Sequence, residues 1–267
     1  MIRILALTVL ILVGLKVDAE AETRRDVAYG PHPDHLLDIY SPADSRNAPI
    51  LVHLHGGGWA MGDKAYPGTT GYKVDHWGGQ GWIFVSVSTR LLPDADPVGQ
   101  AHDLARALAF VQRNATRWGG DSDRLILMGH SAGAHVAMLL AAREDIQETH
   151  GLRSWRGTIS LDTAALDVVE LMRRRPGYIH RAAFGPSLSY WLDASPAVHA
   201  SRDMAPALLV CSTQRTRPCA AALSVARRAP ATVMRVNLSH SEINRELGKP
   251  GPYTSAVDSW LRRQGLP

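Results

Sequence analysis

One stretch decides the fold: Leu125-Ile126-Leu127-Met128-Gly129-His130-Ser131-Ala132-Gly133. An apolar run leads into a Gly-x-Ser-x-Gly element, and mostly small residues follow as far as Ala142. This order predicts a strand, a sharp turn and a helix, with Ser131 presented on the turn as a nucleophile. Glycine suits the positions on either side of the turn, because side chains there would collide where the strand and the helix approach each other. The alternative is an ordinary glycine-rich turn.

The same alternation of strand and helix runs along the chain. Strands are predicted at Leu36–Tyr40, Pro49–Leu54, Trp82–Ser88, Arg124–Met128, Trp155–Leu161, Ala207–Cys211 and Thr232–Leu238. Helices are predicted at Pro97–Arg117, Ala132–Arg143, Leu166–Arg175, Ala220–Ala229 and Ser255–Arg263. Several strands are continuous apolar runs, as expected for strands covered on both faces. The pattern predicts one α/β domain, with a mostly parallel sheet and helices on both faces.

Residues 176–205 interrupt this alternation. They contain Tyr178, Phe184, Tyr190 and Trp191 but no clear strand. A long segment inserted above a sheet often forms a lid or a pocket wall, so a short lid-like insertion is one interpretation. A packed surface excursion is the other.

A second glycine-rich element, His55-Gly56-Gly57-Gly58-Trp59, directly follows a predicted strand. Three glycines in a row let the backbone curl so that its N–H groups point at one place. The N–H groups of Gly57 and Gly58, with that of Ala132, are predicted to form an oxyanion hole. His55 is interpreted as a buttress for the loop. A flexible turn or a phosphate-binding loop is the alternative, although no Gly-Lys-Ser/Thr follows.

The base is expected on a loop beyond the last strand, where an imidazole reaches the nucleophile. His240 follows the predicted strand Thr232–Leu238 and is therefore predicted to be the base for Ser131. The remaining histidines downstream of the nucleophile are interpreted as structural or surface residues: His135, His150, His180 and His199.

The acid of the triad is not at its usual place, because residues 212–218, the loop after the penultimate strand, contain no carboxylate. An Asp at the end of the preceding strand can also orient the imidazole and stabilise its charge. Asp162, which follows Leu161, is therefore predicted to be the acid. Asp203 and Glu242 are the rivals, and Asp162 could instead cap the following helix.

The charge and the cysteine content of the chain indicate which kinds of partner and metal site to expect. The net charge of +4 is spread along the chain and does not indicate nucleic-acid binding. Cys211 and Cys219 are the only cysteines, and in an oxidising compartment such a pair usually forms a disulfide, with two free thiols as the alternative. A metal site is not expected, because two thiols without a nearby His leave the ligand set incomplete.

The beginning of the chain predicts export. A short positive start precedes the mostly apolar run Ile4–Leu15, and Ala19-x-Ala21 fits a signal-peptidase site. Residues 1–21 are therefore predicted to be a signal peptide, and residues 22–267 a periplasmic or secreted domain without stable membrane insertion. A retained membrane anchor is the alternative, although the run is shorter than the roughly 20 residues that span a bilayer.

Taken together, these motifs resemble those of bacterial α/β-hydrolase esterases of the hormone-sensitive-lipase and feruloyl-esterase-like branch, which also includes arylformamidases. Further matches are Gly62-Asp63-Lys64, Arg90-Leu91-Leu92-Pro93, Gly119-Gly120-Asp121 and Ile243-Asn244-Arg245. The resemblance implies a short-chain ester or formamide substrate, no metal and no organic cofactor. It also implies that Ser131 is the nucleophile and His240 the base. The implied oxyanion donors are Gly57, Gly58 and Ala132. Such families usually have Asp on the loop where this chain has Arg215 to Arg217.

The chain is therefore predicted to be a serine hydrolase, a carboxylesterase that cleaves small esters through an acyl-serine intermediate. An arylformamidase or other small-amide hydrolase is one alternative. A catalytically weakened binding protein with the same fold is another, and the missing loop carboxylate is the feature that favours it. The sequence leaves the oligomeric state open.

Overall fold

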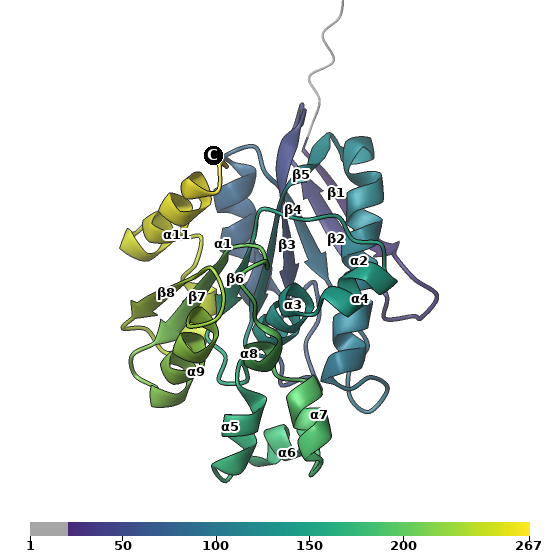
Figure 1. The fold of residues 1–267 in the computed structure, drawn as a ribbon. Coiled ribbons are helices and arrows are strands. Elements are labelled where there is room, and N and C mark those ends of the chain that lie inside the picture. Colours follow the sequence, from purple (N-terminus) through teal and green to yellow (C-terminus); the bar gives the residue numbers. More distant parts are fainter. Residues whose placement is uncertain (1–20) are drawn as a thin grey trace, which may run out of the picture.

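The structure, a computed structural model, describes residues 21–267 (Figure 1). The predicted signal peptide, apart from Ala21, lies outside the described residues. The centre of the molecule is an eight-stranded sheet with the order β1-β2-β4-β3-β5-β6-β7-β8. Its strands are β1 (Glu22–Ala28), β2 (Leu36–Ser41), β3 (Ala48–Leu54), β4 (Ile83–Val87), β5 (Gly120–His130), β6 (Gly157–Leu161), β7 (Ala207–Ser212) and β8 (Ala231–Val236).

Six neighbouring strands, from β4 to β8 in the sheet order, pair in parallel, whereas β1 pairs antiparallel with β2 and β2 antiparallel with β4. The prediction of a mostly parallel sheet is thus confirmed. The central strands are buried on both faces because successive side chains enter different cores. In β5, Leu125 and Leu127 join one core, while Ile126 and Met128 join the other.

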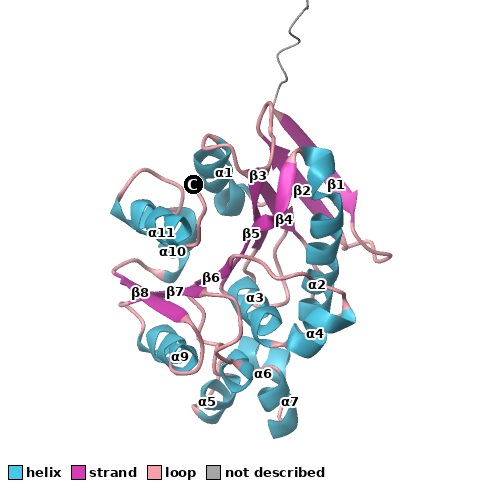
Figure 2. Ribbon diagram, turned by 45° about the horizontal axis from the view of Figure 1, so that its top comes forward, coloured by secondary structure: helices cyan, strands magenta, loops and turns pink. Residues whose placement is uncertain are grey.

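Helices cover both faces of the sheet (Figure 2). The helices α2 (Pro97–Asn114), α3 (Ala132–Ala142) and α9 (Thr216–Ala226) lie on one face, and α1 (Pro67–Gly78), α10 (His240–Arg245) and α11 (Pro252–Arg263) on the other. The shorter helices are η1 (Ala115–Trp118), α4 (Glu144–Thr149), α5 (Val168–Arg173), α6 (Tyr178–Phe184), α7 (Leu188–Asp193) and α8 (Pro196–His199). Among residues 21–267, none of the helices combines the length and the apolar character that a membrane-spanning helix needs.

Several predicted boundaries are wrong. The helix expected at Ala220–Ala229 begins four residues earlier, at Thr216, because Pro218 lies in its first turn, where a missing N–H removes no intrahelical bond. The helix expected to reach Arg117 ends at Asn114 and continues as the 3₁₀ turn η1. The helix expected at Leu166–Arg175 is the six-residue α5.

The interruption at residues 176–205 is helical and consists of α6, α7 and α8. Figure 1 shows α5, α6 and α7 grouped at one end of the molecule. The segment is tied to the body of the fold, because the ring of His135 on α3 donates from Nε2 to the carbonyl of Ala194 at 2.8 Å. Ile179 of α6 lines the same cavity as Ser131, so part of this segment is a pocket wall.

Candidate active site

The turn between β5 and α3 holds Ser131 in a strained backbone conformation, with φ 55° and ψ −116°. A Cβ on Gly129 would lie 2.3 Å from the carbonyl oxygen of Gly133. A Cβ on Gly133 would lie 2.2 Å from the carbonyl oxygen of His55. Only glycine fits both positions, so the close approach of strand and helix explains the Gly-x-Ser-x-Gly pattern.

His240 reaches Ser131 from the loop after β8. Its Nε2 lies 3.0 Å from the hydroxyl oxygen of Ser131. His240 is the first residue of α10, which Ser239 caps by accepting from the N–H of Glu242. The helix start thus fixes the backbone from which the imidazole extends toward Ser131.

Asp162 lies at the end of β6, and its buried carboxylate meets the other side of the imidazole. Oδ2 is 2.7 Å from Nδ1 of His240, and Oδ1 accepts from the N–H of Ser212 at 2.9 Å. Burial alone would raise the pKa of the Asp162 carboxyl. Hydrogen bonds from His240 and Ser212, together with the charge of Arg215, outweigh burial and hold this pKa below its ordinary value.

The two rival candidates for the acid, Glu242 and Asp203, make other interactions. Glu242 forms a capping box, because its Oε2 accepts from the N–H of Ser239 at 2.8 Å. Asp203 is exposed, and its N–H donates to the hydroxyl of Ser201. Within residues 21–267, neither carboxylate has a recorded hydrogen bond to His240.

Arg215 contacts both Asp162 and His240, which was not predicted from the sequence. Its Nη1 lies 2.5 Å from Oδ2 of Asp162 and 2.7 Å from Nδ1 of His240. Arg215 follows β7 and occupies the N-cap position of α9 without a capping hydrogen bond from its side chain, so the loop that lacks a carboxylate instead brings a guanidinium to Asp162 and His240.

His130 was also missed. Its ring lies beside that of His240, with centroids 4.6 Å apart, and its Nε2 donates to the carbonyl of His240 at 3.0 Å. Burial, followed by the nearby charge of His240, lowers the pKa of His130 to about 3. His130 therefore stays neutral and anchors the first residue of α10.

The glycine loop after β3 lines the cavity in front of Ser131. Gly57 and Gly58 both have positive φ, 130° and 60°, which favours glycine. The described residues provide no recorded acceptor for the N–H of either glycine, and Ala132 opens α3, where N–H groups lack intrahelical partners. His55 buttresses the loop, since its Nδ1 lies 2.6 Å from the carbonyl oxygen of Gly56.

His135 connects this loop to α3 and to the 176–205 segment. The indole N–H of Trp59 donates to Nδ1 of His135 at 3.2 Å, and the opposite ring nitrogen donates to Ala194. Burial lowers the pKa of His135 to about 4, so the ring stays neutral and keeps one acceptor and one donor.

The cavity at Ser131 has a volume of about 750 Å³. Its wall includes the apolar side chains of Met61, Tyr66 and Ile179, and the charged residues Asp63 and Arg245. This volume falls within the range of small-molecule sites.

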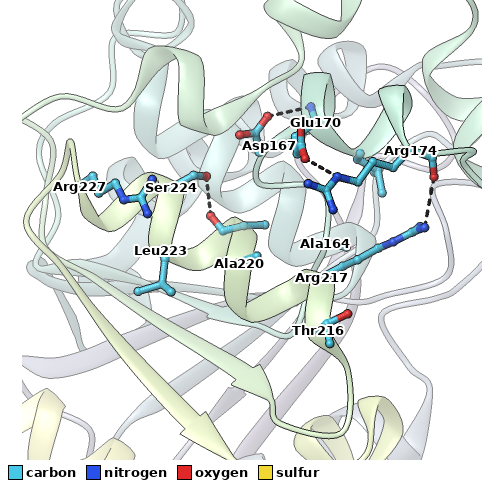
Figure 3. A pocket seen from close by; sticks show the side chains of 12 residues that line it. Ala164, Asp167, Glu170, Arg174, Thr216, Arg217, Ala220, Leu223, Ser224 and Arg227 are labelled. Carbon is cyan, nitrogen blue, oxygen red and sulfur yellow. Dashed lines mark hydrogen bonds and ion pairs between the residues drawn. The ribbon is translucent and has the colours of Figure 1, made fainter.

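A second hollow of about 460 Å³ lies between α5 and α9 (Figure 3). Arg174 is paired with Glu170 in this hollow, and Arg217 donates to the main-chain carbonyl of Arg174. None of the predicted catalytic residues lines it, so the cavity in front of Ser131 is the candidate substrate site.

Cys211 and Cys219 form a disulfide that joins the end of β7 to the first turns of α9. Arg215 lies inside the closed loop. Among residues 21–267, no group of three or more His, Cys, Asp or Glu side chains is arranged to hold a metal ion.

Residues 37–169 match the BD-FAE family model. A probable isoprenylcysteine alpha-carbonyl methylesterase, ICMEL2 of Arabidopsis thaliana, is 33% identical over 132 residues, which are 49% of this chain and 31% of that protein. Esterase LipQ of Mycobacterium tuberculosis is 37% identical over 123 residues, 43% of this chain and 28% of its own length. The chain thus spans about a third of the length of these curated relatives.

Solved structures share the fold at low identity. Esterase B from Lactobacillus rhamnosis superposes with a TM-score of 0.70 at 20% identity, covering 94% of this chain and 87% of that chain. A truncated carbohydrate esterase from gut microbiota gives a TM-score of 0.77 at 16% identity, covering 93% and 98%. This likeness supports the α/β-hydrolase fold predicted from the sequence.

Proposed function

Because residues 37–169, about half of the chain, belong to the BD-FAE esterase family, we propose that this protein is a serine carboxylesterase that cleaves small carboxylic esters. One observation carries the proposal. Ser131 Oγ lies 3.0 Å from Nε2 of His240, and Nδ1 of the same ring lies 2.7 Å from Oδ2 of Asp162. This is the arrangement that a nucleophile, a base and an orienting acid require.

In the first step, Ser131 Oγ attacks the carbonyl carbon of the ester while its proton moves to Nε2 of His240. The carbon–alkoxy bond then breaks, and the departing alkoxide takes that proton and leaves as the alcohol. Asp162 holds Nδ1–H and stabilises the charge of the imidazolium. The product of this step is an acyl-serine.

In the second step, water gives a proton to Nε2 and attacks the acyl-serine carbonyl. Ser131 Oγ leaves, recovers the proton and releases the carboxylic acid. In both steps a negative charge develops on the carbonyl oxygen. The N–H groups of Gly57, Gly58 and Ala132 are the donors we propose for it.

The cavity favours a small, partly apolar ester, because Met61, Tyr66 and Ile179 contribute apolar surface beside Ser131. No described contact favours a formamide over an ester. The weakened-binding-protein hypothesis rested on the missing loop carboxylate, and the 2.7 Å contact from Asp162 counts against it.

We also propose that residues 1–21 are a signal peptide and that residues 22–267 act as one domain in the periplasm or outside the cell. The disulfide between Cys211 and Cys219 supports export, since such bonds persist mainly in oxidising compartments.

The proposal is tested with Ser131→Ala. Hydrolysis of p-nitrophenyl acetate and butyrate should fall by several orders of magnitude, because the nucleophile is lost while alanine fits the space. A fluorophosphonate should label the parent protein and not the variant. Retention of more than roughly a thousandth of the parent rate, on the scale that nucleophile removal sets, would refute the assignment.

A further inference from the structure

The guanidinium of Arg215 touches both partners of the acid–base pair. Its Nη1 lies 2.5 Å from Oδ2 of Asp162 and 2.7 Å from Nδ1 of His240, while Oδ2 and Nδ1 are themselves 2.7 Å apart. Three polar atoms therefore form a triangle in which each is within hydrogen-bond distance of the other two.

Only one of the two contacts at Nδ1 can be a hydrogen bond at a given moment. If Nδ1 carries a proton, it donates to Asp162, and Nε2 is free to accept the proton of Ser131. If Nδ1 has no proton, it accepts from Arg215, and the proton of the neutral ring lies on Nε2. In this second arrangement the ring cannot act as the base.

We propose that Arg215 is a positioning residue that restrains the triad by competing with Asp162 for Nδ1 of His240. Its positive charge also opposes the imidazolium that forms during acyl transfer. This inference rests on the proposed esterase function, because it assigns His240 the role of the base.

Asp162 does not need Arg215 to stay in place. Its carboxylate is buried at the end of β6, and Oδ1 accepts from the N–H of Ser212. The side chain of Arg215 is 40% exposed, and within residues 21–267 its recorded hydrogen-bond partners are Asp162 and His240. Removal of the guanidinium should therefore leave the Asp162 carboxylate in its orientation. Nδ1 of His240 would then have Asp162 as its partner without competition from Arg215.

The other titratable groups near His240 do not account for the effect expected from removal of the Arg215 charge. His130 on β5 stays neutral because burial lowers its pKa to about 3, and burial lowers the pKa of Lys73 on α1 to about 7. Burial raises the pKa of Tyr253 on α11, so its hydroxyl stays neutral. Lys73 carries charge at and below about pH 7, but it does so in the parent and in every Arg215 and Arg217 variant alike, so it does not produce a difference between them.

The experiment compares Arg215→Met with Arg217→Met, which removes a guanidinium two residues away that makes no recorded contact with Asp162 or His240. Rates with p-nitrophenyl acetate are measured across pH. Arg215→Met should raise the plateau kcat about threefold to tenfold and move the midpoint of the acid limb up by about one pH unit, the scale of a nearby charge. KM should change less than about twofold, because Arg215 does not line the substrate cavity.

Arg215→Lys keeps a positive charge, so its acid limb should remain near that of the parent, and Arg217→Met should match the parent throughout. A fall in kcat for Arg215→Met, or an unmoved acid limb, would overturn the inference.

A second measurement does not depend on activity. NMR of protein labelled with ¹⁵N-histidine should show the Nδ1–H proton of His240 more fully in Arg215→Met than in the parent, and equal signals would contradict the competition. The two proposals fail separately. If Ser131→Ala retains more than roughly a thousandth of the parent rate, the esterase proposal fails. If only the Arg215 results differ from expectation, the restraint fails alone.

Discussion

Replacement of Asp162 by asparagine removes the carboxylate that contacts His240 while keeping the shape of the side chain. The amide oxygen can still accept from the N–H of Ser212, as Oδ1 of Asp162 does at 2.9 Å, so the fold should persist. The variant loses the negative charge 2.7 Å from Nδ1 and the acceptor that keeps the proton on that nitrogen. The expected effect is therefore on catalysis.

The size of the loss follows from these contacts. Loss of a tautomer-fixing acid lowers kcat by roughly 10³–10⁴. At about 1.4 kcal/mol for each tenfold change, this is about 4–5.5 kcal/mol of transition-state stabilisation. The upper end is expected here, because Nη1 of Arg215 remains 2.7 Å from Nδ1 and no carboxylate opposes its charge.

The assay is steady-state hydrolysis of p-nitrophenyl butyrate, together with circular dichroism and thermal unfolding to show that the variant is folded. Asp203→Asn and Glu242→Gln are the controls and should each cost less than about tenfold, because neither carboxylate contacts the ring. A loss of less than tenfold for Asp162→Asn, or a greater loss for Glu242→Gln, would refute the assignment of the acid.

Two further predictions concern stability. Replacement of both Cys211 and Cys219 by serine should lower the free energy of unfolding by about 2–3 kcal/mol in urea titrations, the value for a loop of this size in the chain-entropy model; an unchanged midpoint would contradict it. Lowering the pH from 7 to 5 should lower the free energy of unfolding by about 2 kcal/mol for each of His130 and His135. In the unfolded chain these histidines bind protons below the ordinary histidine pKa. In the folded protein their rings, with pKa values of about 3 and 4, stay neutral in this range. Equal unfolding free energies at the two pH values would show that this linkage is absent.

The turn that carries Ser131, the proposed nucleophile, was predictable because its requirements are local. The strand, the strained serine and the helix are contiguous, and steric contacts at Gly129 and Gly133 restrict both positions to glycine. The last helix of the site was predictable too, although it was missed. Ser239 and Glu242 have the spacing of a capping box, which signals a helix that begins at His240.

Two elements of the fold left little trace in the sequence. β1 reads Glu-Thr-Arg-Arg-Asp-Val-Ala and is an edge strand, so it shows no apolar alternation. α1 contains three glycines and two threonines, which are poor helix formers. Its buried Trp77 packs in the same core as Trp82 and Phe84, so tertiary contacts outweigh the weak local propensity.

The contacts of Arg215 with Asp162 and His240 follow from how β6 and β7 pair in the sheet, and no local sequence pattern predicts them. The parallel register of β6 and β7 pairs Leu161 with Val210, so the chain leaves both strands at the same edge of the sheet. Asp162 and the loop after Ser212 therefore start about one strand spacing apart, near 4.8 Å. A triad requires a carboxylate at Nδ1 of the base, not at one fixed point of the chain, so the end of β6 can supply it.

With Asp162 in this position, the loop after β7 does not need to supply a carboxylate. A side chain from that loop can still reach Asp162 and His240. In this chain that side chain is the guanidinium of Arg215, which contacts both Asp162 and His240. A buried carboxylate that accepts from the backbone is held rigidly, whereas the half-exposed guanidinium has water as an alternative partner. The proposed acid and base are therefore positioned by the ends of β6 and β8, and under our proposal Arg215, in the loop after β7, restrains the contact between them.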